Sequence, residues 1–486
     1  MPPSTVPAAG RALPGGLSDA LGREWSVAVR ESVRAFALSR AVVWITGLVV
    51  IAAFGWADSR GARLDPLWAC RPTGTPGIDA LVAPGCRWDS TWYLDVARGG
   101  YRSAVPARSA FFPLYPLLVS IVSTPLGGAL VPAGLLVSWS AALGFLTLLH
   151  RVVARARDAA TATTVVRVAA YVPPAIFLSA VYTEALFLLL SLGALVAARR
   201  DRWALAGVLG LVAASCRSIG VLLVVPLAVE YLWGRRGGPQ TRASEGWSPW
   251  ARLAGGRRPA PAGRSFGRRG AVAATAMEGR GWSPAAGVGT LPGARAWLPR
   301  RGLRPDVLWI ALVPLGVALY AAYLGVATGD PMGAVAAQGD WERRFLTPVG
   351  GLLEGAWAVL GRLGDYAGLW HVAPLIPDQM PSVTLARDVV LLAFVVAAIT
   401  VLWWARRRLP ASWVAWGVVS LAYPLSVPSV QQPLMSLPRF TMACFPLVVA
   451  LGLWAHRGRR MRWMAPLLLT LQAGWAVIFV AWIWAP

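Results

Sequence analysis

Apolar segments of about 20 residues alternate with short polar segments along most of this chain, and a helix of that length crosses the hydrocarbon core of a bilayer. The first such segment is AFALSRAVVWITGLVVIAAFGW at 35–56, and the last spans 463–484. Hydrophobic residues make up 56% of the 486 positions and charged residues only 14%. The pattern predicts an all-α polytopic membrane protein with about 10 to 12 transmembrane helices.

Two stretches do not divide cleanly into full membrane crossings. Residues 109–149 are broken by prolines, among them Pro113 and Pro125, so we expect an interfacial helix followed by one membrane-spanning helix. Residues 203–234 are short for two crossings. We therefore expect two short helices that meet at Arg217.

The charge of the chain comes from arginine. All 46 basic residues are Arg, the formal net charge is +24, and the arginines gather in short runs such as 150–157 and 406–408. Runs of this kind between apolar segments follow the positive-inside rule, which places them in the cytoplasm and residues 58–107 on the outer side. We therefore expect a multi-pass protein of the cell membrane, with membrane lipids and no nucleic acid as partners.

Composition divides the chain into four parts. Residues 1–34 lack the apolar core of a cleavable signal peptide, and we expect a disordered cytoplasmic amino terminus. Residues 35–234 form an amino-terminal transmembrane region, which includes the first outer loop at 58–107, and residues 305–486 form a carboxyl-terminal one. Between them, residues 235–304 contain 14 Arg and 2 Glu in a Gly-, Pro- and Ala-rich insert, which predicts a disordered cytoplasmic loop drawn to anionic headgroups or, alternatively, to a specific partner.

The first outer loop is polar and aromatic in an otherwise apolar chain. Its stretch CRWDSTWYLDVARGGY, residues 86–101, carries carboxylate, arginine and large aromatic side chains. Cys70 and Cys86 bracket this loop on the oxidising side, where they either form a disulfide or remain free thiols. Cys216 and Cys444 lie in apolar segments, and we expect both to be small buried side chains.

Several segments, taken in this order, resemble the PIG-V family, the second mannosyltransferases of glycosylphosphatidylinositol assembly and their bacterial relatives. They are RWDSTWYLDVARGGY with FFPLYPLL, the region from SAVYTEALF to AVEYL, TGDPMGAVAAQGDWERR, and SLPRFTMACFPLVVALGLW. The resemblance covers most of the chain outside the amino terminus and the insert.

The resemblance implies a GT-C glycosyltransferase that moves a sugar, typically mannose, from a polyprenyl-phosphate donor to a lipid-linked or cell-envelope glycan at the outer face. An acidic residue of the first outer loop is the base in such enzymes, and Asp89 of RWDS matches that position. Two departures concern substrate detail. Residues 217–220 read RSIG where relatives often have Arg-Pro-Thr-Gly, and Arg439 precedes Phe440 rather than Tyr.

The residues themselves suggest the same chemistry, because inverting transfer from a lipid phosphate needs a base for the acceptor hydroxyl and a cation for the leaving phosphate. Asp89 is the leading base, and Asp95 and Glu184 are the other candidates. The alternative for Asp89 is a helix N-cap. Glu184 either orients the acceptor or a cation as a second carboxylate, or is an acid that favours a helix start.

Four arginines are candidates for the phosphate. Arg217 stands in an apolar stretch, where a charge usually faces a cavity but can also snorkel to the interface. Arg343, Arg344 and Arg439 lie on the outer side against the positive-inside trend, and we favour Arg439 as the phosphate partner.

The candidate substrate-binding aromatics are Trp88, Trp92, Tyr93 and Tyr182. They either stack on a sugar or on isoprene units, or belong to the aromatic belt at the membrane interface. We expect no cofactor and no dedicated zinc site. A divalent cation held by Asp89 and the donor phosphate is left open.

Two other functions compete with this interpretation. A lipid or solute transporter or flippase would use Asp89, Glu184 and Arg217 as an ion path, although these residues cluster at outer helix ends and we find no internal repeat. A GT-C enzyme that uses another sugar, such as a polyprenyl-phosphate pentose, is not distinguished from a mannosyltransferase by the sequence.

Overall fold

The computed structural model describes residues 15–55, 69–70, 75–102, 106–234, 302–367, 381–430 and 432–482. These residues form helices and contain no strand, apart from one isolated bridge between Arg343 and Ser429. The prediction of an all-α protein is confirmed. The insert at 235–304 lies almost entirely outside the described residues.

The part of the chain before the insert contains long helices with short helical breaks between them. In order these are α1 (Gly15–Phe54), α3 (Pro76–Val82), η1 (Ala83–Gly85), α4 (Ser90–Gly99), η2 (Pro106–Ala110), α5 (Leu114–Ser123), η3 (Thr124–Leu126), α6 (Leu130–Ala156), α7 (Ala159–Tyr171), η4 (Pro173–Leu178), α8 (Glu184–Arg199), α9 (Trp203–Ala214), η5 (Ser218–Leu223) and α10 (Val224–Trp233), where η marks a 3-10 helix.

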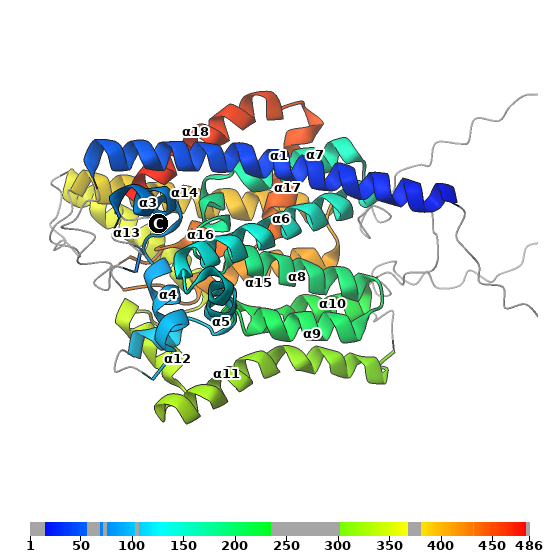
Figure 1. Ribbon diagram of the computed structural model, residues 1–486, viewed down its shortest axis with the longest axis horizontal. Coiled ribbons are helices and arrows are strands. Elements are labelled where there is room, and N and C mark those ends of the chain that lie inside the picture. Colours follow the sequence, from blue (N-terminus) through cyan, green and yellow to red (C-terminus); the bar gives the residue numbers. More distant parts are fainter. Residues whose placement is uncertain are drawn as a thin grey trace, which may run out of the picture.

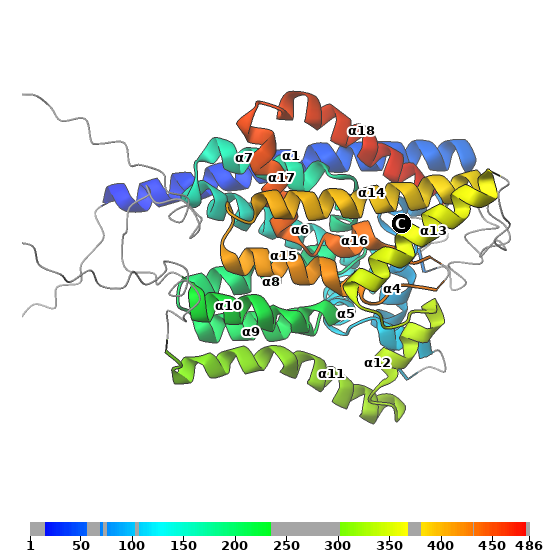
Figure 2. The same ribbon diagram turned by 180° about the vertical axis from the view of Figure 1, so that it is seen from behind.

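The part after the insert has the same character. Its elements are η8 (Pro305–Ala311), α11 (Leu312–Thr328), α12 (Gly333–Ala336), η9 (Ala337–Trp341), α13 (Pro348–Tyr366), α14 (Pro381–Ala405), α15 (Ala411–Leu425), α16 (Leu437–Thr441), α17 (Phe445–Arg457) and α18 (Met461–Val480). Figure 2 shows α13 beside α14 on the far side of the molecule, and Arg362 joins them through an ion pair to Asp388.

Five helices among the described residues are long and apolar enough to cross a membrane, namely Gly22–Phe54, Leu130–Ala156, Pro305–Thr328, Thr384–Ala405 and Met461–Val480. Shorter apolar helices, including α9 and α15, lie beside them. Large apolar side chains such as Ile45 and Leu319 are exposed on the outside of the bundle, as expected of helices that face lipid. The total of 10 to 12 crossings stays a prediction.

The two irregular stretches fold as expected. The prolines of 109–149 separate the short helix α5 from the long helix α6, because proline lacks the N–H that a helix interior needs. Residues 203–234 form α9 and α10, which meet at an extended Arg217 with η5 between them.

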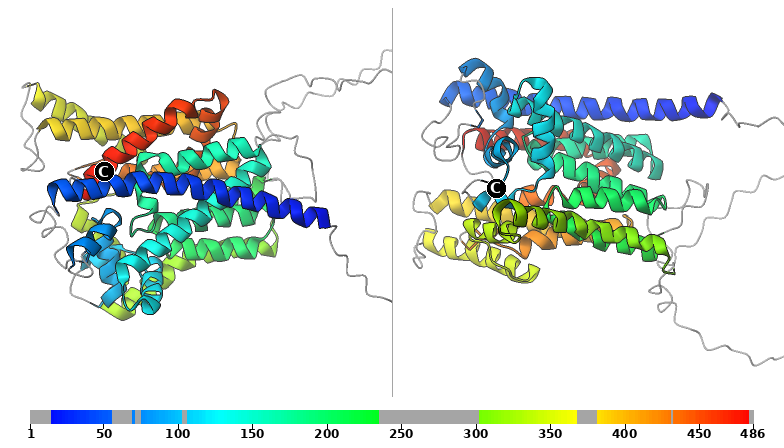
Figure 3. Two further views of the ribbon diagram at one scale, coloured as in Figure 1. Left: turned by 45° about the horizontal axis from the view of Figure 1, so that its top comes forward. Right: turned by 60° about the horizontal axis from the view of Figure 1, so that its bottom comes forward.

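The predicted disorder of residues 1–34 is wrong from residue 15 onward, because α1 begins at Gly15. The helix is held there by charge: Glu24 pairs with Arg151 of α6, and Glu31 pairs with Arg34 and with Arg167 of α7. The amino terminus therefore continues the first membrane helix rather than leading loosely into it. Its first turns extend beyond the neighbouring helices (Figure 3).

A buried arginine stabilises the break between α7 and α8. Arg40 of α1 donates to the carbonyl oxygens of Ala175 (2.8 Å) and Ala170 (3.4 Å) and to the hydroxyl of Ser179. Pro173 and Pro174 supply no backbone donors at this point, so carbonyls near the end of α7 need partners from elsewhere. Arg40 supplies one and the side-chain amide of Gln472 in α18 supplies others, to Ala170 and Val172. The chain then continues through η4 towards Glu184.

Different helices lie at the two ends of the bundle (Figure 1). The last turn of α10 and the start of η8, which flank the insert, lie at one end together with the amino-terminal turns of α1. The helices α3, α4, α12 and α16 lie at the opposite end. The residues predicted to bind substrate gather at that second end.

Candidate active site

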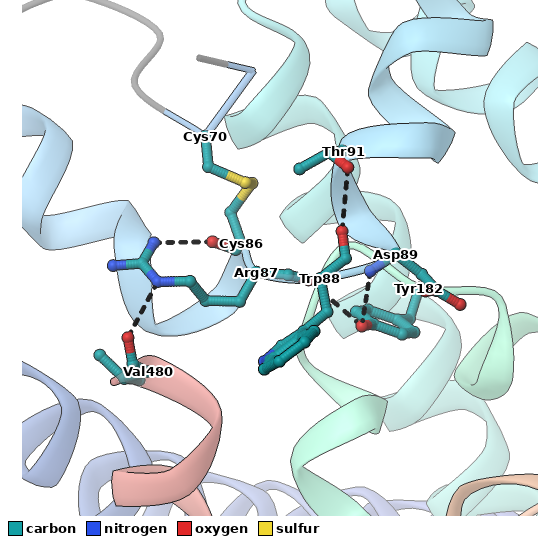
Figure 4. The surroundings of a disulfide bond; sticks show 8 residues. All are labelled: Cys70, Cys86, Arg87, Trp88, Asp89, Thr91, Tyr182 and Val480. Atoms are coloured by element: carbon teal, nitrogen blue, oxygen red, sulfur yellow. Dashed lines mark hydrogen bonds between the residues drawn. A yellow bond between two sulfur atoms is a disulfide. The ribbon is translucent and has the colours of Figure 1, made fainter. Parts of the chain in front are cut away.

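A disulfide lies in the segment between α1 and α4. Cys70 and Cys86 are joined, with their Cα atoms 5.4 Å apart, so the disulfide rather than the pair of free thiols is correct. Arg87 follows at once: its Nε donates to the carbonyl oxygen of Val480 at the end of α18 (3.1 Å), as Figure 4 shows. Cys216 and Cys444 are free and buried, as predicted.

Backbone contacts fix the position of the next two residues. Trp88 has a φ of 57°, a left-handed conformation that is uncommon for a bulky residue, and its indole N–H donates to the carbonyl oxygen of Phe479 (3.2 Å). The backbone N–H of Asp89 donates to the hydroxyl of Tyr182 (3.1 Å), which donates to the carbonyl oxygen of Arg87 (3.2 Å) (Figure 4). Hydrogen bonds to Phe479 and Tyr182 therefore fix the turn that carries Asp89.

The loop that carries Tyr182 is tied to the same turn. The backbone N–H of Val181 donates to the carbonyl oxygen of Gly85 (2.8 Å). Gly134 of α6 lets this loop approach, because a Cβ at that glycine would stand 2.7 Å from a methyl group of Val181. Two segments that are about a hundred positions apart in the sequence thus become one rigid unit.

The side chain of Asp89 does not cap a helix. It stands at the N-cap position of α4 but makes no capping hydrogen bond. Its Oδ2 instead accepts from Nη1 of Arg439 (2.5 Å), and 30% of the side chain is exposed. The structure thus removes the capping alternative for Asp89 and directs the carboxylate into a polar cluster.

Glu184 lies beneath Asp89 at the first position of α8 and is 1% exposed. Its Oε1 accepts from Nη1 of Arg217 (2.5 Å) and from Nε of Arg439 (2.8 Å). Arg217 also donates to the hydroxyl of Thr183 (2.8 Å). Two carboxylates and two guanidinium groups therefore neutralise one another at the base of the site.

Arg343 adds a cation to this cluster. Its Nη1 donates to the carbonyl oxygen of Val427 (3.0 Å), and its guanidinium lies 5.1 Å from the ring centre of Phe440. Among the described residues, no carboxylate pairs with Arg343. Burial lowers the pKa of Arg343 from its ordinary value, so a bound anion would relieve the cost of its buried charge.

These residues surround a cavity of about 400 Å³. The candidate residues on its wall are Trp88, Asp89, Trp92, Tyr93, Tyr182, Arg217, Arg343 and Arg439. Glu184 lies behind them and holds two of the arginines. Burial raises the pKa of Tyr93 to about 12, so its hydroxyl, which lies 3.3 Å from that of Thr183, stays protonated at neutral pH.

Two of the sequence candidates have other partners. Asp95 of α4 forms an ion pair with Arg108 of η2, and Arg344 forms one with Glu354 of α13. Neither Asp95 nor Arg344 lines the cavity. Within the described ranges, no three His, Cys, Asp or Glu side chains are grouped so that they could hold a metal ion.

The comparison with protein families identifies the amino-terminal region. Residues 35–232 match the family described as mannosyltransferase (PIG-V). Over this range, which is less than half of the chain, the protein is similar to the PIG-V mannosyltransferases. No curated protein and no solved structure gives a match.

The matched range contains Asp89, Glu184 and Arg217 and ends before Arg343 and Arg439. The family match, together with the five long apolar helices, supports a membrane mannosyltransferase. Arg343 and Arg439, from the carboxyl-terminal region, line the same cavity as Asp89 and Arg217.

Sequence reasoning missed part of this cavity wall. Gln338 and Trp341 of η9 line it, as do Phe111 and Tyr423, and Tyr423 donates to the hydroxyl of Ser218 (2.9 Å). The signal available for Trp341 was its place two residues before Arg343, within the segment QGDWERR. Nothing in the local pattern indicated which side of η9 faces the site.

Proposed function

We propose that this mannosyltransferase takes mannose from a polyprenyl-phosphate donor and transfers it, with inversion, to a lipid-linked or cell-envelope glycan. The observation that carries the proposal is the meeting of a partly exposed carboxylate and three arginines in one cavity. Such a cavity offers a base at one point and a place for a phosphate close by.

In the proposed reaction, Asp89 takes the proton of the acceptor hydroxyl. The hydroxyl oxygen forms a bond to the anomeric carbon of mannose as the bond from that carbon to the phosphate oxygen breaks, and the polyprenyl phosphate leaves with the electron pair. Arg439 holds Oδ2 of Asp89. Because no described residue bonds to Oδ1, that oxygen is the one available to the acceptor.

We assign the phosphate to Arg343. Arg217 and Arg439 are already neutralised by Glu184 and Asp89, whereas Arg343 has no carboxylate partner among the described residues. A lipid phosphodiester carries one negative charge and would balance it. This differs from our preference for Arg439 on the sequence alone, and it gives Arg439 the role of orienting the base.

The outer face is the side of the membrane that the proposal requires. The arginine runs place residues 58–107 outside, and disulfides persist in oxidising compartments. The helices α4 and α16, which carry residues of the cavity wall, lie at the end of the bundle opposite to the helix ends that flank the insert. A lipid-borne donor reaches this end from the bilayer.

The clustering of charges argues against an ion path. A carrier would need ionisable groups spaced through the membrane, but Asp89, Glu184 and Arg217 join one network at one end of the bundle through Arg439. A proton that entered at Asp89 would meet a buried carboxylate already held by two guanidinium groups.

The direct test is donor use by the purified protein in lipid nanodiscs. Three labelled donors would be offered with membrane extract as acceptor: polyprenyl-phosphate mannose, a polyprenyl-phosphate pentose and GDP-mannose. We expect covalent transfer of mannose from the lipid donor only, with loss of transfer in Asp89→Asn. Transfer from GDP-mannose, or movement of lipid without covalent transfer, would overturn the proposal.

A further inference from the structure

The cavity has two chemically different walls. One wall carries the guanidinium groups of Arg217, Arg343 and Arg439. A second group of lining residues consists of Trp92, Trp341 and Gln338, none of which is charged. A ligand that fills the cavity therefore meets both the cations and an uncharged wall of two indole rings and an amide.

The aromatic wall is built by packing between segments far apart in the chain. Trp92 follows Asp89 by three positions, so both lie on the same face at the start of α4. The ring of Trp92 stacks on Phe111 with centroids 5.7 Å apart and planes at 13°. Trp341 meets the same phenylalanine in an edge contact at 6.0 Å, which brings η9 against α4.

Gln338 stands beside Trp341. The two are three residues apart in the 3-10 helix η9, where side chains at that spacing lie one above the other. Within the part of the chain that the structure describes, the Gln338 side chain donates a single long hydrogen bond, 3.5 Å, to the carbonyl oxygen of Ala334. Its amide therefore keeps donor and acceptor capacity for a ligand in the cavity.

This combination suits a neutral sugar. A pyranose presents a face of C–H groups that packs on an aromatic ring and a rim of hydroxyls that bond to an amide. A phosphate gains less from such a wall than from the arginines, because the wall offers neutral donors but no cation. Asp89 belongs with both groups of residues, because it pairs with Arg439 and lies one helical turn from Trp92.

We propose that Trp341, Gln338 and Trp92 form the subsite for the sugar of the acceptor. The inference rests on the proposed function and adds to it an order of binding sites across the cavity. The donor phosphate lies at Arg343, the acceptor sugar lies on the aromatic wall, and the acceptor hydroxyl lies between them at Asp89.

The experiment compares two soluble probes on protein in nanodiscs, because glycoside detergents would compete. Farnesyl phosphate reports the donor side, and a series of octyl glycosides (mannoside, glucoside and galactoside) reports the acceptor side. The variants are Trp341→Ala and Gln338→Ala. Trp357→Ala is the matched control, since that tryptophan lies on α13 with 75% of its side chain exposed.

We expect both η9 variants to weaken binding of at least one octyl glycoside by about tenfold, the loss of one aromatic or amide contact, and to leave farnesyl phosphate binding unchanged. The control should change neither. No saturable glycoside binding to wild type, unchanged glycoside binding in both variants, or an equal loss for farnesyl phosphate would overturn the subsite. Farnesyl phosphate binding to wild type, and its loss in Arg343→Gln, tests the proposed donor site independently.

Discussion

Two buried arginines, Arg40 and Arg439, lie in regions of this protein with different designs. Arg40 is 6% exposed and bonds to carbonyl oxygens and a serine hydroxyl around the break between α7 and α8. Arg439 is 8% exposed and bonds to Asp89 and Glu184 beside a cavity. Both arginines stand in apolar surroundings, but they have different kinds of partner.

The difference teaches how to interpret a charge in a membrane segment. A charge among apolar residues is taken as a sign of function, and that reasoning selected Arg217. Arg40 stands in the first apolar segment and satisfies the same criterion, yet its partners are two backbone carbonyls and a serine hydroxyl around the break. The partner set and the nearness of a cavity, rather than burial, separate the functional charge from the structural one.

The largest effect should come from Asp89→Asn, which removes the proposed base and keeps the size of the side chain. General-base assistance is worth on the order of 100 to 10,000-fold, so single-turnover mannose transfer should fall by that factor while donor affinity changes little. Asp330→Asn, an exposed change away from the cavity, is the matched control. Near-normal transfer by Asp89→Asn would exclude Asp89 as the base.

Glu184→Gln tests how much the buried ion pairs at the base of the site contribute to stability. It leaves Arg217 and Arg439 with a single carboxylate between them, and breaking a buried ion pair costs about 3 to 5 kcal/mol of unfolding free energy. The measurement is unfolding in mixed micelles, compared with Glu354→Gln, whose partner Arg344 is largely exposed. An unchanged stability would mean that the buried network is not what holds α8 to α16.

Arg343→Gln tests the donor side of the cavity. A hydrogen bond to a charged group contributes about 1.5 to 3 kcal/mol, so farnesyl phosphate should bind roughly ten- to hundredfold more weakly. Arg344→Gln removes the neighbouring arginine, which is paired with Glu354, and should leave that affinity unchanged. Equal losses in the two variants would indicate a diffuse attraction to positive charge rather than a site at Arg343.

Arg40→Met should give the smallest effect on activity. The carbonyl oxygen of Ala175 and the hydroxyl of Ser179 would lose the Arg40 donor, which costs about 1 to 3 kcal/mol of stability. Turnover per folded molecule should stay unchanged because Arg40 does not line the cavity. Leu38→Met, on the exposed side of the same helix, serves as control. A loss of turnover at unaltered stability would contradict the contrast between Arg40 and Arg439.

Much of the architecture could be predicted from local pattern. Apolar length identifies membrane helices such as α6 and α18, and proline placement explains the breaks in 109–149. The pattern failed at residues 15–34, where helix α1 depends on ion pairs with α6 and α7. The local pattern also does not predict the structural role of Arg40. Its partners lie around the break between α7 and α8 and come within reach only when α1 packs there.

The sequence by itself determined which chemical groups are present and on which side of the membrane we expect them: a carboxylate after the first helix, two cysteines around the loop, and arginines against the positive-inside trend. Only the tertiary structure decided their pairing. Arg439 reaches Asp89 across 350 positions of sequence, and Trp341 reaches the cavity through Phe111. Helix formation follows from residues three or four apart, whereas the charge balance that leaves Arg343 unpaired with any described carboxylate is a property of the whole packed bundle.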